Sequence, residues 1–197
     1  MNIRGTWHLF NLGVLLFVTA LTAVGGGKVT VKFDLALPLF LKVASYDDSF
    51  QGGKQFDSVK VYVLYDPAQA VSCRQTQEAE KYFRENSQLK VLGTPCGYQA
   101  LPLADADSVL NSVGQRNYSI LVVTSLAYEK VKPLLQAIER MKVRTFAIDS
   151  EQVKEGLAVG LKVDDKATTI IVNMEAAKLE GSKFSAHLLK ICELYNN

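Results

Sequence analysis

Short runs of apolar residues, each ended by polar or turn-forming residues, recur along most of the chain. A parallel strand that is covered on both faces reads as such a run. The clearest one, 118–124, is rich in β-branched residues, and the run 59–65 ends at Asp66 and Pro67. The runs predict strands at 59–65, 89–92, 118–124 and 143–148, with a further extended segment at 98–103.

Segments with helical periodicity lie between these runs. Their apolar residues recur at i, i+3, i+4 and i+7, which places them on one face of a helix. Pro133 falls inside the last such segment, so we expect either a kink there or a helix that starts near Glu129. The predicted helices cover 35–46 with Asp34 as cap, 71–86, 106–113 with Asp105 as cap, and a segment that ends near 141.

The last third of the chain changes pattern. Two apolar runs, 157–163 and 168–172, flank the polar connector 164–166, which predicts a hairpin. Asn173 is placed to cap a short helix at 174–179. A final helix is predicted from an apolar stripe of Phe184, Leu188, Ile191, Cys192 and Tyr195.

Alternation of strands and helices indicates an α/β fold. Such an order favours a parallel or mixed sheet with flanking helices and right-handed crossovers. The C-terminal hairpin and helix complete it. A chain of 197 residues is long enough for one domain with a sizeable core, and we see no linker or internal repeat that would divide it.

The N-terminus predicts export. Residues 1–8 carry one charged side chain, Arg4, and residues 9–24 are apolar and free of charge. Small residues and three glycines follow, which is the order of a secretory signal peptide. We therefore expect a signal peptide at 1–23, a mature domain at 28–197, and a periplasmic location without a membrane span after cleavage. An uncleaved anchor is the alternative, although the apolar run is short for a span.

Charge makes nucleic acid an improbable partner. The chain carries 22 basic and 20 acidic side chains, a net charge of +2, and the two signs are mixed along its length. No basic block or stripe stands out, whereas nucleic-acid-binding domains concentrate positive charge on one face.

The expected export bears on the oxidation state of the three cysteines. An oxidising compartment allows a disulfide, and we expect one between Cys73 and Cys96. Both residues follow predicted strands, so parallel strands would bring them to the same edge of the sheet. Cys192 lies on the apolar stripe of the last helix, where we expect a free thiol. Three free thiols are the alternative.

Catalytic and metal-binding patterns are missing from the sequence. His187 is the one histidine outside the leader, and no nucleophile, phosphate-loop or dinucleotide motif occurs. Without a histidine–cysteine cluster we expect no metal site. We therefore expect a protein that is not an enzyme and that needs no cofactor.

Polar residues at the ends of strands form the candidate site. Asp66, Ser125, Asp149 and Ser150 each follow a predicted strand. In a doubly wound sheet such residues gather outside the carboxyl ends of the strands, where ligands bind. They are candidates for a ligand or partner crevice. Capping of the helices that follow is the alternative use of these residues.

The last third of the chain also carries an ordered set of residues: Gly156, Gly160, Ile170 to Asn173, Ala177, Ser185, Leu188, Leu189 and Lys190. Their order and spacing resemble the C-terminal pattern of the YfiR family. The strand endings at Asp66, Ser125 and Asp149 are also similar, so the resemblance covers roughly residues 33–195. YfiR-like proteins are periplasmic, and several restrain membrane-bound enzymes that make cyclic-di-GMP.

The resemblance implies a regulatory binding protein. Its expected partner is the periplasmic domain of an inner-membrane signalling protein, either a diguanylate cyclase or a sensor kinase. Homodimerisation stays open. The strand-end crevice favours the alternative, a periplasmic module that binds a small ligand in a transport or sensing system.

Overall fold

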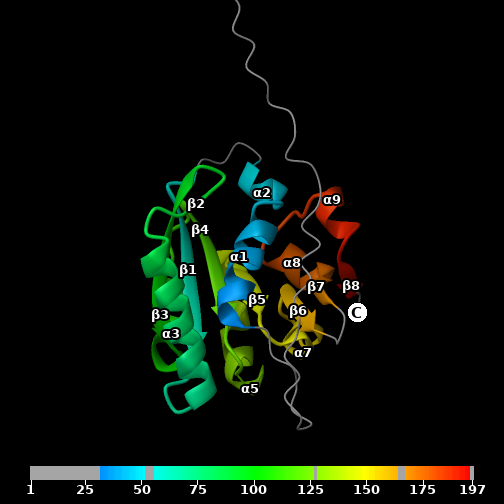
Figure 1. The fold of residues 1–197 in the computed structure, drawn as a ribbon. Helices are drawn as coiled ribbons and strands as arrows, with labels where there is room; N and C mark the ends of the chain where they lie inside the picture. Colours follow the sequence, from blue (N-terminus) through cyan, green and yellow to red (C-terminus); the bar gives the residue numbers. More distant parts are fainter. Residues whose placement is uncertain (1–31, 52–55, 127, 164–166, 196–197) are drawn as a thin grey trace, which may run out of the picture.

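A computed structural model describes residues 32–51, 56–126, 128–163 and 167–195 of the chain. Its strands form one eight-stranded mixed sheet with the order β2-β3-β1-β4-β5-β6-β7-β8 (Figure 1). The strands are β1 Ser58–Tyr65, β2 Lys90–Val91, β3 Thr94–Pro102, β4 Asn117–Val123, β5 Arg144–Ala147, β6 Val159–Val163, β7 Thr168–Asn173 and β8 Glu193–Tyr195. The helices are α1 Phe33–Ala44, α2 Asp48–Gln51, α3 Ala70–Glu85, η1 Leu103–Asp105, α4 Ala106–Asn111, α5 Tyr128–Val131, η2 Lys132–Leu134, α6 Leu135–Met141, α7 Ser150–Lys154, α8 Met174–Leu179 and α9 Ala186–Leu189.

The centre of the sheet is a doubly wound parallel unit. Strands β3, β1, β4, β5 and β6 are mutually parallel, and in chain order this is the arrangement 2-1-3-4-5. β7 runs antiparallel to β6 as the second strand of the predicted hairpin, and β8 adds parallel to β7. The α/β fold with a mixed sheet, flanking helices and a C-terminal hairpin is confirmed.

Two apolar layers cover the sheet, one on each face. Along β4, Tyr118, Ile120 and Val122 point into a core shared with α1 and α3. Leu121 and Val123 point to the other face, where α4 and α6 pack. This division follows from right-handed crossovers, which bring α3 to one face and α4, α6 and α7 to the other. The apolar runs are buried on both sides, as the sequence predicts.

Helix starts were predicted less well than helix positions. Asp34 and Asp105 make no side-chain cap bond, and Asp34 lies inside the first turn of α1 instead. The break expected at Pro133 is confirmed, because the chain there passes from α5 through η2 to α6. A proline interrupts helical hydrogen bonding, which accounts for the 3-10 segment.

The prediction of one long C-terminal helix is wrong. Helix α9 has 4 residues, and the chain then becomes strand β8. Ile191, expected in the core, is 62% exposed. Pairing of β8 with β7 provides backbone hydrogen bonds that a helix end lacks, so sheet extension overrides the helical period.

The predicted disulfide between Cys73 and Cys96 is wrong. Both residues are free cysteines in the structure, as is Cys192. Cys96 pairs with Val59 at the amino end of β1, whereas Cys73 lies in the first turns of α3, beyond the carboxyl end of β1. The length of β1 separates them by roughly 20 Å, far more than a disulfide can bridge. The sequence reading placed the second strand at 89–92, but β2 is a 2-residue antiparallel strand and the parallel neighbour is β3.

Several predictions concern residues outside the described ranges. They are the signal peptide at 1–23 and the connector 164–166. Among the helices that the structure describes, none combines the length and the apolar character that a membrane span needs.

Candidate functional site

Three of the four predicted site residues end adjacent strands at the same level. Leu64 pairs with Val123, and Val123 pairs with Ala147, across β1, β4 and β5. Asp66, Ser125 and Asp149 each lie two residues beyond these partners, and Ser150 begins α7. The crossovers after β1 and β4 leave toward opposite faces, so the topological switch point lies between these strands. We call Asp66, Ser125, Asp149 and Ser150 the carboxyl-edge site.

Asp66 forms the charged part of the carboxyl-edge site. Its Oδ2 accepts a short hydrogen bond from the Lys130 ammonium, and its Oδ1 accepts one of 2.9 Å from the Ala68 N–H. These contacts, led by the Lys130 hydrogen bond, hold the pKa of Asp66 below its usual value. The Asp66 side chain is 10% exposed and that of Lys130 is 41% exposed, so a ligand can reach the cation first.

A chain of hydroxyl groups ties the start of α3 to the ends of β1 and β4. The Asp66 N–H donates to Ser72 Oγ at 3.0 Å, and Ser72 Oγ lies 2.7 Å from Thr124 Oγ1. Thr124 Oγ1 in turn donates to the Leu64 carbonyl at 2.8 Å. Because the Thr124 proton is used there, Ser72 donates to Thr124. The end of β1 is thereby fixed against its neighbour.

Gln75 fixes the backbone and side chain of Ser125. Its Nε2 donates to Ser125 Oγ at 2.9 Å, and its Oε1 accepts from the Ser125 N–H at 2.8 Å. Sequence reasoning missed Ser72 and Gln75. The signal was present, because they continue the inward stripe of Ala79 and Phe83 toward the start of the helix with polar residues.

Asp149 behaves as the capping alternative predicts. Its side chain accepts a hydrogen bond of 3.0 Å from the Glu151 N–H and caps α7. Gln152, one turn on, donates from Nε2 to the Leu126 carbonyl at 2.6 Å. Its Oε1 is buried and has no hydrogen-bond partner within the described structure. A buried amide oxygen without a hydrogen-bond partner destabilises the folded state. The β5 side of the carboxyl edge therefore contains an unpaired hydrogen-bond acceptor.

Asp66 and Ser125 have other local roles than capping. The N-cap residue of α3 is Gln69, whose side chain makes no cap hydrogen bond. The backbone N–H groups in the first turn of α3 therefore have no side-chain cap, and this turn is tied to Asp66 through the Ser72 hydroxyl. Together these groups can recognise an anionic group and a cationic group of one ligand.

No histidine belongs to the carboxyl-edge site, and Cys73 lies beside it with its Sγ 3.5 Å from the Pro67 carbonyl oxygen and 3.7 Å from that of Asp66. His187 lies elsewhere, with its ring centroid 5.8 Å from that of Tyr46 in the α1–α2 turn. Within the described ranges, no group of three or more histidine, cysteine or acidic side chains could hold a metal ion.

A second polar cluster, which the sequence did not predict, is buried at the amino end of the sheet. Tyr118 donates to Asp47 Oδ2 at 2.7 Å, and the Arg144 guanidinium lies 4.4 Å from the Tyr118 ring centroid. Burial raises the pKa of Asp47, but hydrogen bonds from Ser49, Lys183 and Tyr118 outweigh it, and the pKa lies below its usual value. The cluster ties the α1–α2 turn to the loop after α8, which is a structural role.

Glu180 is buried beside this cluster. Its carboxylate accepts from the Thr145 N–H at 2.7 Å and from Thr145 Oγ1 at 2.5 Å. Burial raises the pKa of Glu180 to about 8, because desolvation exceeds the effect of the Thr145 hydrogen bonds and the Arg144 charge.

Comparison with known proteins reveals likeness at the level of structure. No family model matches the chain, and no curated protein matches it. A conserved domain protein from Vibrio cholerae superposes with a TM-score of 0.56 and 12% identity, covering 86% of this chain and 61% of its own. The ABC domain in complex with L-Trp from Streptococcus pneumoniae superposes with a TM-score of 0.57 and 10% identity, covering 83% of this chain and 60% of its own.

A third solved structure is similar. It is the ligand-free, open structure of a substrate-binding protein with adhesive properties from Clostridium difficile, with a TM-score of 0.58 and 16% identity. It covers 85% of this chain and 60% of its own. At these identities the likeness establishes a shared fold, and this chain spans about three fifths of the length of each of the three neighbours.

Proposed function

We propose that this chain is a binding protein of an exported transport or sensing system, and that it takes a small ligand at the carboxyl-edge site. The observation that carries the proposal is the register of β1, β4 and β5, which aligns Asp66, Ser125 and Asp149 at the switch point of a doubly wound sheet. Ligands bind outside the carboxyl ends of strands at such a point.

The chemistry of the edge favours a ligand that carries opposite charges. A ligand carboxylate would pair with the Lys130 ammonium and with N–H groups of the first turn of α3, which has no side-chain cap, and a ligand ammonium would pair with Asp66. Amino acids fit this description. The pneumococcal neighbour is described in complex with L-Trp, which makes that amino acid a sensible first probe.

Thermal unfolding in the presence of amino acids tests the proposal. A ligand that binds only the folded state raises the melting temperature, and the rise grows with the logarithm of ligand concentration above the Kd. We expect at least one amino acid to raise the melting temperature of the wild type, and we expect Lys130→Met and Asp66→Asn to remove the effect. Equal shifts in wild type and both variants would place binding elsewhere.

The same two strands offer a matched control. Arg116 and Asp57 precede β4 and β1 and form an ion pair of 2.9 Å at the opposite end of the sheet. Arg116→Met removes an exposed ion pair of similar type without touching the carboxyl edge. It should leave the ligand-induced shift unchanged, whereas loss of the shift in this variant would count against the site.

Regulation of a membrane signalling protein is the second candidate. The resemblance to the YfiR family supports it, as does the exposure of Leu179, Ile191 and Leu194, which are 44%, 62% and 43% exposed. Deletion of the gene should then change the cyclic-di-GMP level or the activity of a sensor kinase. Loss of solute uptake, with both of these unchanged, would favour the ligand-binding proposal alone.

A further inference from the structure

Strand β3 has a free edge along its carboxyl half. β3 is flanked by β1 on one side and by β2 on the other, but β2 pairs only with Thr94 and Pro95. The Cys96 N–H donates to the Leu89 carbonyl at 2.9 Å, so Cys96 directs its backbone groups away from β1. Backbone direction alternates along a strand. The backbone groups of Tyr98 and Ala100 therefore also point outward, where no described strand pairs with them.

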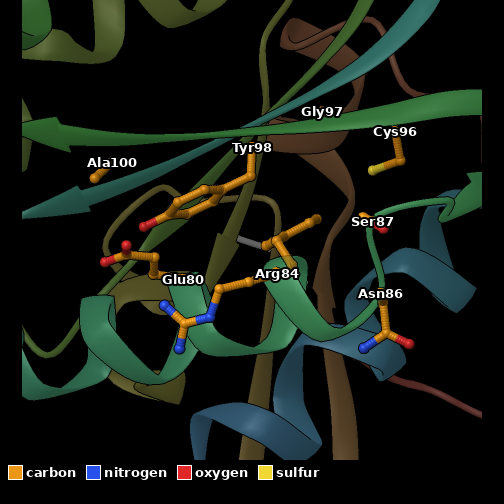
Figure 2. A pocket seen from close by; sticks show the side chains of 9 residues that line it. Glu80, Arg84, Asn86, Ser87, Cys96, Gly97, Tyr98 and Ala100 are labelled. Atoms are coloured by element: carbon orange, nitrogen blue, oxygen red, sulfur yellow. The ribbon is translucent and has the colours of Figure 1, made fainter.

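A groove of about 590 Å³ runs beside this edge, between β3 and α3 (Figure 2). The rings of Phe83 and Tyr98 are stacked in it, with centroids 4.9 Å apart. Figure 2 shows Cys96, Tyr98 and Ala100 along the strand, facing Glu80 and Arg84 from the helix. A side chain carried by a strand added to the edge would enter this groove from the α3 side of the sheet.

Lys60 lies on the opposite face of the sheet, beside the same edge. Its neighbours Val59 and Val61 point into the core under α1 and α3, so Lys60 points to the other side of the sheet. It pairs with Gly97, and its Nζ lies 3.4 Å from the point that a Cβ at Gly97 would occupy. The lysine thus lies across the glycine, toward the free edge.

The charges around the edge are mainly positive. Arg84 in the groove and Lys60 on the other face have no ion-pair partner among the residues that the structure describes, and exposed Lys90 lies on β2. Glu80 is the one acidic residue that lines the groove. A second copy of the chain, paired edge to edge, would bring both sets of cations together. The charge pattern therefore fits an acidic partner.

We propose that the free edge of β3 binds an extended segment of a partner protein in which acidic and apolar residues alternate. The segment adds a strand through the backbone groups of Tyr98 and Ala100. Its apolar side chains lie against Tyr98 and Phe83 on the α3 face, and its opposite face presents acidic residues to Lys60. Because side chains alternate along a strand, one segment can satisfy both faces.

A short capped peptide in which glutamate and valine alternate is the probe. We expect it to bind the full chain, to slow hydrogen exchange at the amides of Tyr98 and Ala100, and to leave that of Gln99 unchanged. Lys60→Glu should weaken binding about tenfold and should allow the corresponding lysine–valine peptide to bind. Arg74→Glu, an exposed substitution on α3 outside the groove, should leave the affinity as it is.

Methylation of peptide nitrogens adds an internal control. Blocking alternate N–H groups on one edge of the peptide should abolish binding, while blocking the other set should preserve it. The proposal is overturned if the peptide does not bind, if both methylated forms bind equally, or if Lys60→Glu and Arg74→Glu act alike. Concentration-dependent dimerisation that protects Tyr98 and Ala100 without peptide would instead assign the edge to a second copy.

Discussion

At the scale of single residues, Glu180 couples the fold to pH. Its pKa is raised to about 8 by burial, so folding favours the protonated form. A raised carboxyl pKa contributes stability that is fully present below the ordinary value of 4.5 and is lost as the pH rises through about 8. Stability should fall over this window.

Glu180→Gln should remove that dependence. The amide keeps a hydrogen-bond acceptor for Thr145 and cannot ionise, so the variant gains on the wild type by on the order of a few kcal/mol between about pH 5 and about pH 8. Urea unfolding at several pH values measures the difference. Glu175→Gln, at an exposed residue of α8, is the control, and its free energy of unfolding should follow the same pH dependence as that of the wild type. If Glu180→Gln also follows the wild-type pH dependence, Glu180 does not couple the fold to pH.

Gly160 permits α7 to lie close to the sheet. A Cβ at this position would meet Val153 Cγ2 at 2.4 Å and the Ala147 carbonyl oxygen at 3.3 Å. The valine is β-branched and cannot turn away freely. Gly160 thus has a packing role in this chain.

Gly160→Ala should therefore destabilise the fold by about 1–3 kcal/mol through overpacking. Val153→Ala removes the clashing methyl, so the double variant should be more stable than the sum of the two single changes predicts. Denaturant unfolding of the four proteins gives the coupling. Strict additivity would show that the contact with Val153 does not limit this position.

At the scale of elements, the sequence predicted correctly those strands that are buried on both faces. β1, β4 and β5 were found because strands covered on both faces are continuous apolar runs. The segment 184–195 was misread because an apolar spacing of i, i+4, i+7 matches a helix, and nothing local shows that β7 offers a free edge to β8. β2 was misread as a parallel strand because pairing partners are set by the whole sheet.

The carboxyl-edge site was likewise predicted in part. Asp66, Ser125 and Asp149 were predictable, since parallel strands share their carboxyl edge. The hydroxyl chain through Ser72 and the amide pair of Gln75 were missed, because they depend on how α3 is placed over the strand ends.

Asn173 is the cap that the sequence predicted correctly. Its Oδ1 accepts from the N–H groups of Glu175 and Ala176, each at 3.1 Å, and its Nδ2 donates to the Val153 carbonyl at 3.0 Å. Asn173→Ala should cost about 1–3 kcal/mol, because it uncaps α8 and removes the buried hydrogen bond to the Val153 carbonyl. Chemical denaturation measures this loss. Ser185→Ala, at the looser cap of α9, should cost less, and an equal cost would contradict the assignment.

At the scale of the whole molecule, the two ends of the sheet differ in burial. The amino end is closed by the buried cluster of Asp47, Tyr118 and Arg144. The carboxyl end keeps the partly exposed Lys130 and the uncapped start of α3. The three structural neighbours share this fold over about three fifths of their own length. Ligand recognition is therefore expected at the carboxyl end alone.

Backbone amide shifts recorded during titration with a panel of amino acids, beginning with L-tryptophan, test this claim most directly. The account predicts that a binding amino acid perturbs 66–72, 124–126 and 149–152 together, while the amides of Asp57, Arg116 and Tyr118 stay in place. Perturbations centred on those amino-end residues, or no perturbation by any member of the panel, would contradict it.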